Sequence, residues 1–141
     1  MKNLILLLLF FLSFSVMSAQ KIKMKNGIVY VDKKESLKYD KNGFYTLDGV
    51  RLFTIKRVKA KVPSDLHSDG MSRNIEIVYT KVKFSMFDLE FETDIREKKL
   101  IRGFYREKVI NQKGLIDESK AWEFVRLRHK NMSARVEYYR Q

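Results

Sequence analysis

The sequence predicts an α+β fold, in which a bent antiparallel β-sheet is followed by two packing α-helices and a short C-terminal strand. Asx-Gly dipeptides divide the first half of the chain into short runs of strand-forming residues. After Thr93, apolar residues recur at helical spacings instead. An order of strands first and helices afterwards is typical of α+β proteins with antiparallel sheets.

Residues 1–19 have the pattern of an export signal. Lys2 precedes an apolar run over residues 4–12, and the small residues Ser18 and Ala19 precede Gln20. The run is shorter than the roughly 18 residues of a membrane-spanning helix, and no second apolar run follows. We expect cleavage after Ala19 or Ser18, and no stable transmembrane segment afterwards. An uncleaved N-terminal anchor is the alternative. The mature chain, residues 20–141, is then a single α+β domain of a periplasmic or secreted protein.

The expected strands are separated by residues that tolerate positive φ angles. Four Asx-Gly dipeptides favour tight turns, at residues 26–27, 42–43, 48–49 and 69–70. The strand-forming runs cover residues 28–31, 36–39, 44–47, 50–62, 75–84 and 87–92.

The run over residues 50–62 changes the phase of its alternation. Phe53 and Ile55 are apolar at odd positions, whereas Val58 and Val62 are apolar at even positions. Since a shift of one residue turns every side chain to the other face, a β-bulge or bend near Lys56 is expected. Pro63 should end this strand because it donates no hydrogen bond to the ladder.

Two helices should follow the sheet. Asp94 and Glu97 fit a capping box, and Gly103, inside the first helix, suggests a close contact with the sheet. Residues 111–114 should form a turn, after which Asp117 starts the second helix. The apolar face of that helix is expected to contain Ala121, Val125 and a buried Trp122. After Asn131 the pattern fits a strand or a helix, and a strand is favoured.

The chain is strongly basic and contains no cysteine. It has 29 Lys and Arg against 17 Asp and Glu, a net charge of +12. The absence of cysteine excludes disulfides, thiolate metal sites and cysteine nucleophiles. The positive charge lies mainly in residues 20–60 and 93–141, on either side of a mildly acidic middle.

Basic residues on the two helices are the candidate anion-binding site. Those on the first helix recur at spacings of three to four and therefore share a face. The alternative is that the cluster pairs with Glu97, Glu107 and Glu123. The candidates are Lys98, Lys99, Arg102, Arg106, Arg126, Arg128 and Lys130.

Two other clusters suggest catalytic or metal chemistry more weakly. Asp65, His67 and Asp69 alternate in a polar loop and could converge on a divalent metal, although turn chemistry is the simpler explanation, since Asp and His are common in turns. Asp88, Glu90 and Glu92 share one strand face. They could provide paired carboxylates, but cross-strand pairing with basic residues such as Lys81 and Lys83 is the simpler interpretation. No cofactor is expected.

Residues 26–52 (NGIVYVDKKESLKYDKNGFYTLDGVRL) and 91–106 (FETDIREKKLIRGFYR) resemble small exported bacterial proteins of unknown function. The resemblance implies a hairpin-rich sheet followed by helices. It implies no activity, cofactor or binding residue.

We therefore expect a small, non-enzymatic, exported binding or interaction protein whose partner is a protein or a component of the cell envelope. One alternative is an envelope anion-binding protein whose ligand is a polyanion, a glycan or a lipid headgroup. The other is a metal-assisted hydrolase that uses Asp65, His67 and Asp69.

Overall fold

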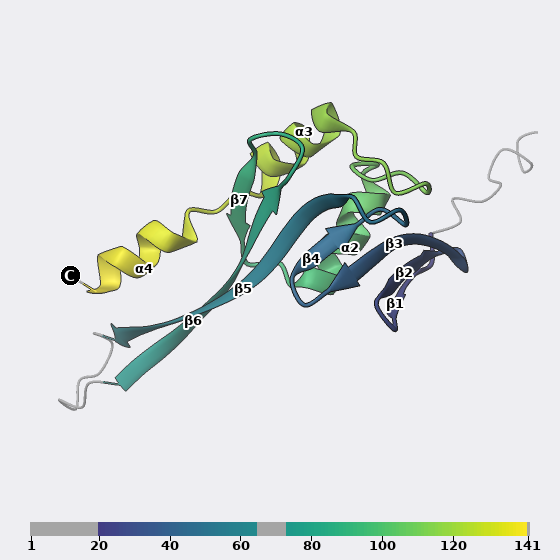
Figure 1. Cartoon of the computed structure of the whole chain (residues 1–141). Coiled ribbons are helices and arrows are strands. Elements are labelled where there is room, and N and C mark those ends of the chain that lie inside the picture. The colour runs from purple at the N-terminus through teal and green to yellow at the C-terminus, as the bar shows by residue number, and fades with distance from the viewer. Residues whose placement is uncertain (1–19, 65–72, 141) are drawn as a thin grey trace, which may run out of the picture.

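A curled antiparallel sheet forms the N-terminal part of the protein, and helices follow it (Figure 1). This computed structural model describes residues 20–64 and 73–140; the predicted signal and residues 65–69 lie outside the described residues. The predicted α+β class and the bent antiparallel sheet are confirmed.

Seven strands pair in chain order, so each strand is the neighbour of the next. The first strand was not among the expected ones, although its pairing partner β2 was. The strands are β1 (Ile22–Lys25), β2 (Ile28–Val31), β3 (Lys34–Asp40), β4 (Gly43–Tyr45), β5 (Arg51–Ser64), β6 (Arg73–Phe84) and β7 (Glu90–Thr93).

Tight turns make this meander possible. Asn26 and Gly27 both take positive φ angles, 52° and 76°, as the Asx-Gly pattern predicts. The turn between β2 and β3 has no glycine, yet Asp32 and Lys33 also have positive φ angles, 50° and 70°. Asp32 is held there because its side chain accepts a hydrogen bond from Lys21 N (2.9 Å) and its backbone N donates to Lys21 O (3.0 Å).

Three helices follow the sheet: α2 (Glu97–Arg106), α3 (Glu118–Arg128) and α4 (Met132–Arg140). The predicted capping box is wrong, because Arg96 is the N-cap residue of α2 and Asp94 instead binds Lys130. The predicted start of α3 is confirmed, since the Asp117 carboxylate accepts a hydrogen bond from Lys120 N (3.0 Å).

The C-terminal segment is the helix α4, and the expected strand is wrong. Met132 and Val136 lie one helical turn apart, and both are buried. They pack with Ala60, Val62 and Tyr79 in a small hydrophobic cluster, which we call the second cluster. A helix forms in place of a strand because helical spacing brings Met132 and Val136 onto the β5–β6 hairpin together.

The same cluster explains the phase change in β5 without a bulge. Cα pairing between β5 and β6 runs unbroken from Phe53–Phe84 to Ser64–Arg73, so the expected bulge near Lys56 is wrong. Phe53 and Ile55 face the main core, whereas Ala60 and Val62 point to the opposite face. β5 ends at Ser64, directly after Pro63. Each half of the strand therefore buries a different face.

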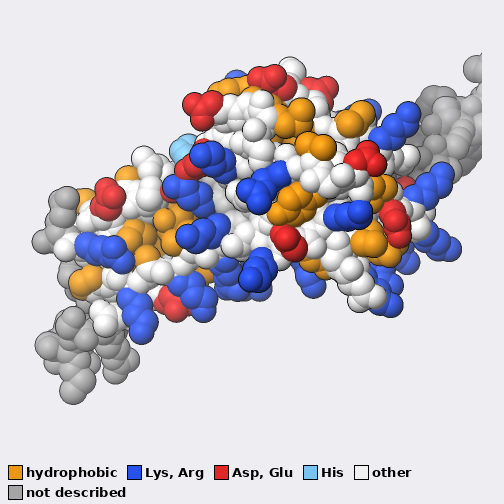
Figure 2. Space-filling model, viewed as in Figure 1, with side chains coloured by type: hydrophobic (Ala, Val, Ile, Leu, Met, Phe, Trp, Pro, Cys, Tyr) orange, Lys and Arg blue, Asp and Glu red, His pale blue; other side chains and the backbone are white. Residues whose placement is uncertain are grey.

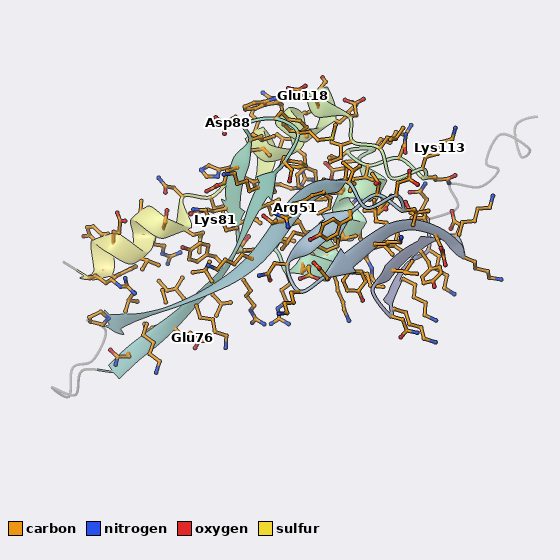
Figure 3. All side chains as sticks on the ribbon, viewed as in Figure 1. Arg51, Glu76, Lys81, Asp88, Lys113 and Glu118 are labelled. Carbon is orange, nitrogen blue, oxygen red and sulfur yellow. The ribbon has the colours of Figure 1, made fainter. Side chains whose placement is uncertain are left out.

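Beyond its neighbours β4 and β7, the β5–β6 hairpin extends as a two-stranded arm, residues 56–64 and 73–79 (Figure 1). Helix α4 covers one face of this arm. On the other face Lys59 forms an ion pair with Glu76 (3.6 Å), toward the end of the arm (Figure 3).

Phenylalanine rings form the main core between the sheet and the helices α2 and α3. Phe104 of α2 contacts Phe53 of β5 (ring centroids 5.5 Å apart) and Phe124 of α3 (4.9 Å). A Cβ added at Gly103 would lie 3.3 Å from the Phe124 ring. The expected close approach at Gly103 is therefore to helix α3 and not to the sheet.

Trp122 is not a core residue, which corrects a further expectation. Its side chain is 49% exposed, and the buried face of α3 consists of Ala121, Phe124 and Val125. Phe124, three positions after Ala121, fills the place that was expected for tryptophan.

Glu92 of β7 joins the sheet to the segment between α3 and α4. Its carboxylate accepts a hydrogen bond from Ser133 N in the first turn of α4 (2.8 Å). Its carbonyl oxygen accepts one from Lys130 N (2.7 Å), and its backbone N donates to His129 Nδ1 (3.2 Å). The carboxylate satisfies an otherwise unpaired N–H group in the first turn of α4, so Glu92 caps this helix together with Asn131, whose Oδ1 accepts a hydrogen bond from Ala134 N (3.4 Å).

We predict that Glu92→Ala lowers the free energy of unfolding by about 1–2 kcal/mol, because it removes this cap from a buried site. Glu92→Gln keeps an acceptor oxygen and should remain close to the wild type. Chemical denaturation measures both values, and hydrogen exchange should show faster exchange confined to α4 in the alanine variant. Equal losses in the two variants would contradict the capping role.

The buried hydroxyl of Tyr105 predicts a loss of stability at alkaline pH. Tyr105 Oη donates a hydrogen bond to Ser36 Oγ (2.8 Å), and burial raises the pKa of Tyr105 to about 12 from an ordinary value of 10.0. Below pH 10 both the folded and unfolded chains keep the proton. Between pH 10 and 12 the unfolded chain loses it first, so stability falls as pH rises.

Tyr105→Phe should therefore flatten the alkaline stability profile relative to the wild type, with a difference of about 2 kcal/mol between the ends of this interval. Denaturation at several pH values measures both slopes, and the comparison cancels the titration of groups common to the two proteins. Parallel profiles would show that Tyr105 keeps its ordinary pKa.

Candidate functional site

Lysine side chains line the outer face of the first hairpin. Alternation along β1 directs Ile22 and Met24 toward the main core and leaves Lys21, Lys23 and Lys25 exposed. These three lysines line a surface hollow of about 360 Å³, together with Tyr30 and Lys33.

A second hollow of about 180 Å³ lies between β1 and helix α2. It is lined by Ile22, Lys23 and Met24 from the strand and by Lys98 and Arg102 from the helix. Lys98 and Arg102 are four positions apart, so they lie on the same side of α2. The fold thereby brings two basic segments together that are more than 70 residues apart in the sequence.

A third hollow of about 540 Å³ lies where α2 begins beside the root of the arm. Its basic side chains are Arg57 from β5, Arg96 from the residue before α2, and again Lys98. Ile55, Val78, Tyr79 and Thr80 provide the sheet side of this hollow. Thr80 is fixed there because its hydroxyl donates a hydrogen bond to Ile95 O (2.7 Å).

The three hollows adjoin at shared lining residues, and we call the basic side chains around them the basic band. The first and second hollows share Lys23, and the second and third share Lys98. All its basic side chains are exposed, and within the described residues none forms an ion pair shorter than 4 Å. The basic band consists of Lys21, Lys23, Lys25, Lys33, Arg57, Arg96, Lys98 and Arg102.

Two acidic residues line the third hollow, but neither neutralises the band. Asp94 is held by Lys130, whose Nζ lies 2.6 Å from Asp94 Oδ2 and lowers the pKa of Asp94. Glu97 is half-buried without an ion pair among the described residues, and burial raises the pKa of its carboxyl. The band therefore concentrates positive charges that repel one another, and a bound anionic ligand would reduce this repulsion.

The predicted anion-binding residues of α2 share its exposed face, but not all of them line the hollows described above. Lys98 and Arg102 belong to the basic band, whereas Lys99 and Arg106 are exposed on the same helix but line none of the three hollows. Arg126 lies on α3, beside a separate hollow. Only part of the predicted cluster therefore contributes to a shared basic surface.

The remaining candidates have structural partners. Arg128 binds Glu107 and lies over the Phe124 ring, with its guanidinium carbon 4.3 Å from the ring centroid. Arg106 shares Glu107 at 3.4 Å. These contacts link α3 to the end of α2, as the ion-pairing alternative predicted for Glu107.

Sequence reasoning missed the contribution of β1 and of the arm to the basic surface. The available signal was the alternation of Lys21, Lys23 and Lys25 directly before the Asn26-Gly27 turn, which is typical of a half-exposed strand. Nothing in the sequence indicated that this strand lies beside α2. Figure 2 shows Lys and Arg side chains over the arm and over the end formed by β1–β3, with acidic side chains gathered over α3.

The predicted cross-strand pairing of acidic residues is confirmed for Lys81. Lys81 Nζ lies 2.7 Å from Glu90 and 3.9 Å from Glu92, and the bond with Glu90 raises the pKa of Lys81. Glu92 is buried, whereas Glu90 is exposed. Asp88 precedes β7 and lies away from Lys81 (Figure 3).

The predicted metal ligands Asp65, His67 and Asp69 lie outside the described residues. Within residues 20–64 and 73–140, no group of three or more His, Asp or Glu side chains is placed to hold a metal ion. None of the helices in these two ranges has both the length and the apolar character needed to cross a membrane.

Comparisons of the chain with protein-family models, with curated proteins and with solved structures found no match. The resemblance to small exported proteins therefore stays a prediction.

Proposed function

We propose that this protein is a small, exported, non-enzymatic binding protein that holds a linear polyanion, such as an acidic glycan, on its basic band. The observation that carries the proposal is the convergence of exposed, unpaired Lys and Arg side chains around three adjoining hollows. The exported location rests on the sequence pattern of residues 1–19.

The shape of the band favours an extended ligand over a compact ion. Lys23 and Lys98 each line two hollows, so neighbouring hollows adjoin and one extended ligand can contact more than one of them. Five of the band's side chains are lysines, which act as point charges and suit sulfate, phosphate or carboxylate groups without demanding bidentate geometry.

The absence of ion pairs within the band, among the described residues, supports a role in binding. Some basic residues outside the band are paired, as Lys81 is with Glu90 and Lys130 is with Asp94, whereas within the described part of the chain none of the eight in the band is. Like charges that gather without partners repel each other, and a bound polyanion replaces this repulsion with attraction while releasing counterions. Binding of this kind weakens as salt rises.

We predict that a triple variant Lys23→Gln, Lys98→Gln and Arg102→Gln loses affinity for heparin by at least about tenfold at physiological ionic strength. The matched control removes the same charge at exposed lysines outside the band, in Lys56→Gln, Lys83→Gln and Lys113→Gln. Calorimetric titration with heparin oligosaccharides at several salt concentrations measures both affinity and salt dependence. The salt dependence should weaken clearly in the band variant and only slightly in the control.

Three outcomes would overturn the proposal. If the wild type shows no heparin binding at low salt, the band does not hold polyanions. If the band variant and the control lose the same affinity, attraction to net charge alone explains the binding. Binding to anionic phospholipid vesicles without binding to heparin would also contradict it, because the ligand would then be a membrane surface.

A further inference from the structure

A separate hollow of about 790 Å³ lies between helix α3 and the start of β7. Trp122, Val125, Arg126 and His129 line it from positions i, i+3, i+4 and i+7, which form one stripe along the helix. Leu89, Glu90 and Glu123 complete the lining. This hollow shares no residue with the basic band and is a shallow site that lies open to solvent.

Trp122 forms an oriented aromatic wall of the hollow. Its Nε1 donates a hydrogen bond to Glu118 Oε1 (3.4 Å), one helical turn earlier. About half of the Trp122 side chain stays exposed, although Ala121 directly before it and Phe124 two positions after it are both buried. The indole is thus held by its polar edge while much of its apolar surface remains open to a ligand.

The rest of the lining combines an apolar part with a polar rim. Leu89 and Val125 are buried and provide the apolar part. Arg126 offers hydrogen-bond donors and forms no ion pair within the described residues. Glu90 and Glu123 offer carboxylate oxygens, each of which also contacts one lysine, Lys81 or Lys120.

His129 adds a hydrogen-bond donor, its Nε2–H group, to the lining of the hollow. Its Nδ1 accepts a hydrogen bond from Glu92 N, so the neutral imidazole carries its proton on Nε2. The second ring nitrogen is therefore a donor, and the residue lines the hollow. The rim presents donors and acceptors side by side.

We propose that this hollow binds a neutral sugar ring. A pyranose has an apolar face of C–H groups, which packs on an aromatic ring, and an edge of hydroxyl groups that both donate and accept hydrogen bonds. The indole of Trp122 matches the first property, and the mixed rim of Arg126, His129, Glu90 and Glu123 matches the second. An anionic ligand would face the two carboxylates, and a purely apolar ligand would leave the rim groups desolvated without partners.

The sequence provides a direct probe, since Trp122 is the only tryptophan of the chain. Its fluorescence should change saturably on titration with tetrasaccharides of glucose, mannose, galactose or N-acetylglucosamine, at micromolar to millimolar concentrations. We expect at least one of these sugars to bind, because a single-ring subsite gives weak but measurable affinity.

Variants separate a sugar site from a general change in the protein. Calorimetry should show loss of sugar binding in Trp122→Ala, partial retention in Trp122→Phe, and at least about tenfold weakening in Arg126→Ala, because the rim then loses charged donors. Lys98→Gln, in the basic band, should bind the sugar as the wild type does. Thermal unfolding of each variant checks that the fold is intact.

The proposal would be overturned if no sugar of the panel caused a saturable change in Trp122 fluorescence. A response to a tryptophan- or leucine-containing peptide in place of the sugars would also overturn it, since the hollow would then be a peptide-docking surface. Sugar binding that is unchanged in Trp122→Ala would place the site elsewhere.

Discussion

The unbroken pairing of β5 with β6 is the constraint on which the rest of the structure depends. The pairs run from Phe53–Phe84 to Ser64–Arg73 without a register shift. Near the sheet the hairpin buries Phe53 and Ile55 in the main core, and farther out it buries Ala60 and Val62 against α4. One hairpin therefore supports two hydrophobic clusters on opposite faces, and the two clusters position different helices.

This arrangement also creates both candidate sites. Packing of α2 in the main core places Lys98 and Arg102 beside β1 and places Arg96 beside Arg57 at the root of the arm. Burial of Phe124 in that core turns Trp122 outward, beside the start of β7. Glu92 then fixes the segment after α3, where His129 completes the hollow between α3 and β7. The hydrophobic core thus determines which polar side chains meet at the surface.

Much of the fold could be predicted from the sequence because local chemistry determines it. The Asn26-Gly27 turn and the start of α3 at Asp117 depend on neighbouring residues alone. The errors arise where distant contacts decide. The phase change in β5 needs α4 for its explanation, and the choice of Phe124 over Trp122 for the core depends on packing against α2. Of the residues in the basic band, only Lys98 and Arg102 were predicted from the sequence. The rest could not be, because only the tertiary fold places β1 beside α2.

We infer that one regular hairpin packs against two hydrophobic clusters on its opposite faces. Nuclear Overhauser contacts in solution are the most direct test of this arrangement. A regular hairpin gives contacts between the cross-strand pairs Ile55–Val82, Arg57–Thr80 and Lys59–Val78, with no residue skipped at Lys56. The same arrangement also predicts methyl contacts from Val136 to the second cluster, and none from Val136 to Ile55. A register shift at Lys56, together with contacts from Val136 to Ile55, would contradict this arrangement and restore a bulge as the cause of the phase change.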